Sequence, residues 1–157
     1  MFNIYLCGGM GKFGKENFDI GNEWRAYFKE KIEDGYIDTY VCNPNDHFNF
    51  KDERDFISDH EVMEYDLYKV RNSDLVVVNF NDPQSIGSAM ELAIAYEKKI
   101  PILGLCEHNE ELHPWLKTVC NRIFTDREEL FLYLGKHYLE INKNGFPLFY
   151  CDDWEVK

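Results

Sequence analysis

Short apolar runs alternate along this chain with longer segments whose apolar residues recur every three or four positions. The short runs predict strands at residues 2–7, 38–42, 75–80, 100–105 and 122–124. The longer segments predict helices at residues 17–33, 58–71, 88–98 and 126–139, with a shorter helix at the end of residues 108–120. Strands and helices in alternation predict an α/β fold: a doubly wound, mainly parallel five-stranded sheet in flavodoxin-like order, with helices on both faces.

Three segments lack such periodicity. Residues 8–14 are rich in glycine, and residues 43–55 form a polar and aromatic stretch that we expect to be a loop over the sheet edge. Residues 142–157 are expected to be a C-terminal tail of a single domain spanning residues 1–157. Thr125 followed by Glu128 resembles a capping box and predicts the start of the last helix.

The most informative segment runs from the third strand into the helix that follows it. Residues 75–80 are apolar and rich in valine, which is typical of a strand at the centre of a parallel sheet. The polar turn after this strand lies at its carboxyl end, where open α/β sheets bind ligands. Because the following helix is expected to carry Glu91 in its first turn, Glu91 is a candidate nucleophile facing a pocket.

Composition and charge limit the classes of molecule that the protein is expected to bind. The formal net charge is −12, which argues against a nucleic-acid polymer because neutralising phosphates needs a basic surface. The longest apolar runs fall far short of the roughly 20 residues that span a bilayer. The first residues lack the basic segment of a signal peptide, so we expect a cytoplasmic protein without a membrane partner. The five cysteines form no C-x-x-C pair and are expected to be reduced thiols.

The glycine-rich loop matches two phosphate-binding motifs incompletely. Gly9, Gly11 and Gly14 fit G-x-G-x-x-G, but the second strand has no acidic residue at its end. Residues 9–15 fit the start of a P-loop, but Glu16 stands where that motif needs serine or threonine. The loop is better interpreted as a place where the backbone approaches a small ligand beside the first strand.

The sequence gives little support for a metal site or for a Ser-His-Asp catalytic triad. The pairs His60-Glu61 and His108 with His113 do not match H-E-x-x-H, so we expect neither a metal nor another cofactor. Ser85 and Ser88 lie at a strand-to-helix turn and leave a Ser-His-Asp triad open, although the sharp G-x-S-x-G turn is missing.

Asp66 allows two interpretations. It is either a solvated acid on a helix surface or a carboxylate that reaches the same crevice as Glu91. Two carboxylates around one anomeric carbon are the recurring machinery of glycosyl transfer, in which one attacks and the other handles the leaving group.

Several segments resemble the nucleoside 2-deoxyribosyltransferase family, which includes the related 2′-deoxynucleoside 5′-phosphate N-hydrolases. The resemblance runs from residue 2 to about residue 105 and is carried by IYLCGGM at residues 4–10, YDL at 65–67, NSDLVV at 72–77 and GSAMELAIAY at 87–96. The spaced set of Tyr5, Asp66, Gly87 and Glu91 is more specific than any one of these residues alone.

The resemblance implies an enzyme in which Glu91 attacks C1′ of a 2′-deoxyribonucleoside, releases the base and passes the sugar to a second base. It implies that Tyr5 orients Glu91 and that Asp66 helps to protonate the departing base. The implied partners are a deoxynucleoside or deoxynucleotide and a free base, in a homo-oligomer without a cofactor. The substrate-binding residues that it implies are Gly8, Gly9, Met10, Ser85, Gly87 and Ser88.

One difference from the family pattern leaves more than one function possible. Many transferases of the family carry an acid six residues before the nucleophile, where this chain has Ser85. A serine there resembles the 5′-monophosphate N-glycosidases, because a hydroxyl and the following helix N-terminus can hold a phosphate. The deoxyribosyltransferase is the preferred function and the monophosphate N-glycosidase is the alternative. A non-catalytic nucleotide sensor on the same sheet is a third hypothesis.

Overall fold

A parallel sheet forms the centre of the molecule. The computed structural model describes residues 1–10, 16–48 and 58–140. Five parallel strands pair in the order β2-β1-β3-β4-β5, which confirms the α/β class and the flavodoxin-like order expected from the sequence. The strands are β1 (Phe2–Gly8), β2 (Thr39–Cys42), β3 (Leu75–Asn79), β4 (Ile102–Leu105) and β5 (Arg122–Phe124).

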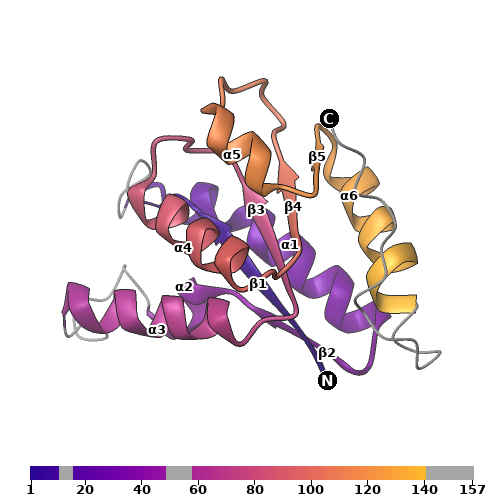
Figure 1. Cartoon of the computed structure of the whole chain (residues 1–157). Coiled ribbons are helices and arrows are strands. Elements are labelled where there is room, and N and C mark those ends of the chain that lie inside the picture. Colours follow the sequence, from indigo (N-terminus) through magenta and orange to yellow (C-terminus); the bar gives the residue numbers. More distant parts are fainter. Residues whose placement is uncertain (11–15, 49–57, 141–157) are drawn as a thin grey trace.

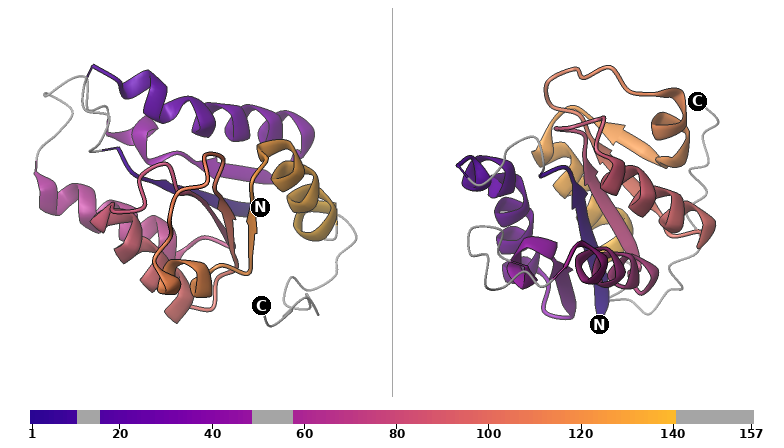
Figure 2. Two further views of the ribbon diagram at one scale, coloured as in Figure 1. Left: turned by 90° about the horizontal axis from the view of Figure 1, so that it is seen from above. Right: turned by 90° about the vertical axis from the view of Figure 1, so that its left-hand side faces the viewer.

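Helices cover both faces of this sheet (Figures 1 and 2). They are α1 (Phe18–Gly35), α2 (Pro44–His47), α3 (Asp59–Arg71), α4 (Ile86–Glu97), α5 (Pro114–Val119) and α6 (Arg127–Leu134), the last continued by the π-helical segment η2 (Gly135–Leu139). Within the described ranges, no helix combines the length and the apolar content that a membrane crossing requires.

The alternation of β1 divides the core into two halves. Ile4 and Leu6 point to one face, where they pack with residues of α1, α6 and η2. Tyr5 and Cys7 point to the other face and pack with residues of α3 and α4. Since successive side chains of a strand point to opposite faces, β1 joins the two layers and supplies residues to each.

At three helices, side-chain caps account for differences from the expected elements. Ser85 accepts a hydrogen bond from the backbone N–H of Ser88, so α4 begins two residues early and Glu91 lies in its second turn rather than its first. Asn43 caps the short helix α2 inside the expected loop. Asp126, rather than Thr125, caps α6, which gives way to η2 after Leu134.

Some expectations lie outside the described residues. They concern residues 11–14 of the glycine-rich loop, residues 49–55 of the expected loop, the tail at residues 142–157 and the thiol of Cys151. Cys7, Cys42 and Cys106 are free thiols, as expected.

Candidate functional site

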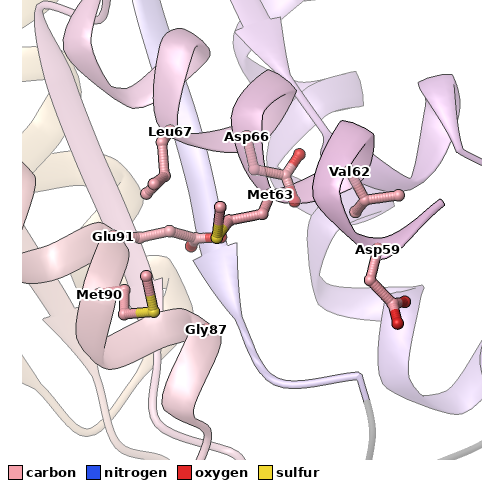
Figure 3. A pocket seen from close by; sticks show the side chains of 8 residues that line it. All are labelled: Asp59, Val62, Met63, Asp66, Leu67, Gly87, Met90 and Glu91. Atoms are coloured by element: carbon pink, nitrogen blue, oxygen red, sulfur yellow. The ribbon is translucent and has the colours of Figure 1, made fainter.

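A cavity of about 380 Å³ lies between α3 and α4. Helix α3 contributes residues spaced three or four positions apart, which places them on one side of that helix. Figure 3 shows Asp66 and Glu91 projecting from the two helices toward the space between them. The cavity is lined by Asp59, Val62, Met63, Asp66, Leu67, Gly87, Met90 and Glu91.

Two side chains of β1 form hydrogen bonds with Glu91. The hydroxyl of Tyr5 donates a hydrogen bond to Oε1 of Glu91 across 3.1 Å. The Cys7 thiol also bonds Glu91 and lies 3.8 Å from the carbonyl oxygen of Ser88. Burial raises the pKa of Tyr5 and of Cys7 well above their ordinary values, and the negative charge of Glu91 raises both further. Both groups therefore stay protonated and act as donors to the carboxylate.

The electrostatics of Glu91 are a balance of opposing effects. Burial raises its pKa, because a carboxylate loses its hydration inside the protein. The hydrogen bonds from Cys7 and Tyr5 and the positive charge of Arg25 oppose this rise. These three groups favour the ionised form, which is the form that can act as a nucleophile.

Asp66 lies on α3 at the same cavity and has a different environment. Burial, followed by the charge of Glu91, raises its pKa from 3.8 to about 7, while Arg25 acts in the opposite direction. Its Oδ1 atom is buried and finds no hydrogen-bond partner among the described residues. Buried polar atoms seldom lack a partner, so this oxygen is an exception among the buried groups of the protein.

The environments of Asp66 and Glu91 favour different protonation states, as acid-base catalysis requires. Asp66 holds its proton up to about neutral pH and can donate it. Glu91 receives hydrogen bonds that stabilise its charge. Pairs of carboxyl groups whose environments separate their roles in this way recur in enzymes that cleave glycosidic bonds.

The glycine turn after β1 packs against the rest of the protein. A Cβ atom on Gly8 would lie 2.9 Å from the ring of Trp24, and one on Gly9 would lie 2.6 Å from Cβ of Asp82. The sulfur of Met10 accepts a hydrogen bond from Arg25. None of the three turn residues, Gly8, Gly9 and Met10, lines the cavity, and their role in substrate binding stays a prediction.

Replacing Gly9 by alanine is expected to destabilise the fold by about 1–3 kcal/mol, because the added methyl group overlaps Asp82. Gly87 is the matched control, since a Cβ atom there meets nothing within 4 Å and alanine is the better helix former. Urea unfolding of both variants measures the difference. Equal stability of the two variants would contradict the close packing of the turn.

The serines at the start of α4 are engaged with each other. The hydroxyl of Ser88 donates to Oγ of Ser85 at 3.0 Å, and Oγ of Ser85 also accepts from the Ser88 backbone at 3.2 Å. Ser85 therefore acts as the helix cap. A contact of either hydroxyl with a sugar or a phosphate stays a prediction.

Three contributors to the site escaped the sequence analysis. The sequence pattern predicts only a reduced thiol at Cys7 and indicates no role for Arg25. Asp59 shares a helix face with Asp66 because the two lie seven residues apart, a spacing that could have signalled it once Asp66 was suspected. Within the described ranges, no group of three histidine, cysteine or acidic side chains is placed to hold a metal ion.

Several solved structures share this fold. A conserved protein from Enterococcus faecalis has a TM-score of 0.73 at 18% identity, over 87% of this chain and 98% of its own. The 2-deoxyribosyltransferase of Bacillus psychrosaccharolyticus has a TM-score of 0.65 at 18% identity, over 83% and 91%. A CMP N-glycosidase from Clostridium botulinum has a TM-score of 0.55 at 20% identity, over 86% and 98%. At these identities the likeness shows the fold alone.

A comparison of the sequence with family models identifies the family of this chain. No curated protein sequence matches the chain. The model of the family described as nucleoside 2-deoxyribosyltransferase matches residues 4–148, which extends well past residue 105, where the resemblance was expected to weaken. The match includes β1, α3 and α4, the elements that supply Tyr5, Asp66 and Glu91. The chain therefore belongs to the nucleoside 2-deoxyribosyltransferase family.

Proposed function

We propose that the protein is a nucleoside 2-deoxyribosyltransferase that works through a covalent bond between Glu91 and deoxyribose. The observation that carries the proposal is the pairing of a Tyr5-bonded Glu91 with a protonated Asp66 across one cavity. The cavity falls within the size range of small-molecule sites. Membership of the family and the shared fold with a 2-deoxyribosyltransferase support the same reaction.

In the first step a carboxylate oxygen of Glu91 attacks C1′ of the deoxynucleoside. The C1′–N bond breaks, and its electron pair goes to the base nitrogen. Asp66 donates its proton to the departing base and becomes a carboxylate. The products are a free base and a glutamyl ester of deoxyribose. Tyr5 keeps one carboxylate oxygen of Glu91 in place during the attack.

In the second step a nitrogen of the incoming base attacks C1′ of the ester. The bond between C1′ and the Glu91 oxygen breaks, and its electron pair restores the carboxylate. The proton that the new base loses returns to Asp66. This cycle leaves both acids as they began, and it requires no other reactant.

The chemistry accounts for a 2′-deoxy sugar as the substrate. The transition state carries positive charge on C1′ and the ring oxygen. The Glu91 carboxylate lies close enough to stabilise that charge. A 2′-hydroxyl withdraws electrons and raises the energy of the cation, so a ribonucleoside reacts more slowly.

A second candidate is a 2′-deoxynucleoside 5′-monophosphate N-glycosidase, in which water replaces the second base. Two observations favour it. Ser85 caps α4, whose first backbone N–H groups point out of this end of the helix, a favourable position for an anion. A CMP N-glycosidase also shares the fold.

Chromatography of product mixtures distinguishes the two reactions. Deoxyinosine incubated with free adenine is expected to yield deoxyadenosine and hypoxanthine. The same protein incubated with deoxyinosine monophosphate, without a base, is the comparison, since deoxyribose 5-phosphate in that sample indicates the hydrolase. Formation of the sugar phosphate without any base exchange would overturn the transferase, and release of no base from either substrate would overturn both reactions and favour a nucleotide sensor.

A further inference from the structure

Arg25 is a buried cation on α1, the helix that covers the face of the sheet opposite the cavity. Its side chain extends from α1 and is 1% exposed. Its guanidinium lies 4.7 Å from the ring centroid of Trp24. Nη2 donates to the carbonyl oxygen of Gly8 at 2.6 Å, Nε to that of Leu6 at 3.4 Å and Nη1 to that of Gly21 at 3.2 Å.

Two of these acceptors belong to the part of β1 that is not paired with β2. Pairing with β2 stops at Tyr5, opposite Cys42, whereas pairing with β3 continues to Gly8. The carbonyl groups of Leu6 and Gly8 lie in the stretch beyond the end of β2, and Arg25 donates to both. The guanidinium thus holds the end of β1 where the sheet no longer does.

The residues on either side of Leu6 are the ones that hold Glu91. Tyr5 and Cys7 alternate with Leu6 along β1, and their side chains point to the α4 face. A shift of the β1 backbone at Leu6 and Gly8 would therefore move the Tyr5 hydroxyl and the Cys7 thiol relative to the carboxylate.

Arg25 carries a positive charge inside the protein. Burial lowers its pKa, but a guanidinium stays protonated at neutral pH. In the part of the chain that the structure describes, no carboxylate forms an ion pair with it. The ionisable groups that raise its pKa are Tyr5 and Cys7 of β1, Glu91 of α4 and Asp66 of α3.

We propose that Arg25 is a positioning residue for Glu91: it fixes the end of β1 that holds this carboxylate and places a buried positive charge behind that strand. The proposal rests on the role of Glu91 as nucleophile. Arg25 acts through β1 and through its field, since it does not line the cavity. The direction of its effect on the pKa of Glu91, which it lowers, agrees with this role.

The test compares Arg25→Met with Arg25→Lys. Methionine removes the charge and keeps an unbranched side chain, whereas lysine keeps the charge and loses the planar fork of donors. For Arg25→Met we expect the rate of base release at pH 7 to fall by about tenfold or more with little change in KM. The acid limb of its pH-rate profile should move upward by on the order of 1 pH unit. For Arg25→Lys we expect a lower rate with the acid limb near its wild-type position.

Phe28→Leu is the matched control, because Phe28 is buried on the same helix and carries no charge. It should lower stability without moving the acid limb. The proposal is overturned if the acid limb of Arg25→Met stays at the wild-type position, or if lysine restores it no better than methionine. If Arg25→Met does not fold, Arg25→Gln takes its place and carries the same expectations.

A second readout does not depend on turnover. The ¹³C signal of the Glu91 carboxyl group, assigned by its loss in Glu91→Gln, reports the pKa of Glu91 directly. We expect that pKa to be higher in Arg25→Met than in the wild type, and equal values would overturn the proposal. Absence of activity in the wild-type protein would instead refute the proposed function, so the two failures are distinguishable.

Discussion

Replacement of Glu91 by glutamine is expected to lower base exchange between deoxyinosine and adenine by about 10³-fold or more, as removal of a nucleophile does in other enzymes that use one. The amide keeps the size of the side chain and can still accept the hydrogen bond from Tyr5. It cannot form the ester with C1′. Initial rates of deoxyadenosine formation measure the loss.

Folding and activity should separate in this variant. Burial raises the pKa of Glu91, so the neutral amide removes a buried charge, and we expect stability to be equal or higher. Tyr5→Phe is the companion variant, because it leaves the carboxylate and removes one hydrogen bond, with a smaller expected loss of rate. An exchange rate of Glu91→Gln within tenfold of the wild type would exclude Glu91 as the nucleophile.

Replacement of Asp66 by asparagine is expected to slow base release by about 10²-fold or more, because asparagine has no proton to give to the leaving base. The pKa of Asp66 near 7 adds a signature in pH. The wild-type rate should fall above pH 7, as the protonated form is lost, whereas the residual rate of the variant should lack this fall. A wild-type profile that stays level from pH 6 to pH 9 would contradict this role.

The same substitution should affect stability in a pH-dependent way. The pKa of Asp66 is about 7 in the folded protein and near 3.8 when unperturbed, so the folded state binds the extra proton between these values. Stability of the wild type therefore falls as pH rises through this window, and the variant escapes the loss. Asp66→Asn should exceed the wild type by up to roughly 4 kcal/mol at pH 8 and by little at pH 4. Urea unfolding at the two pH values tests this, and equal gains at both would contradict it.

Apolar periodicity was sufficient to predict the layers of this fold. Five strands and the main helices follow from where apolar runs end, since each run must reach the core. Helix starts were less predictable because single side chains decide them. Ser85 and Asn43 each accept a backbone hydrogen bond, and this shifted the start of α4 and added α2.

The candidate site was only partly predictable from pattern. The position of Glu91 after the central strand is sufficient to predict it as a candidate. The roles of Tyr5 and Asp66 are implied by the resemblance to the family. Arg25 could not be found in this way, because composition places arginine at the surface. Its hydrogen bonds to the carbonyl groups of Leu6 and Gly8 depend on β2 ending before β1 does, which no local pattern reveals.

The two methionines that line the cavity, one from each helix, have a consequence for the range of leaving groups. Met63 and Met90 are unbranched and adopt many side-chain rotamers at little cost. Such walls can be re-formed around a one-ring or a two-ring heterocycle without moving the backbone. Tolerance toward both pyrimidines and purines would then arise from side-chain rotation, with selectivity left to the polar side chains that line the cavity.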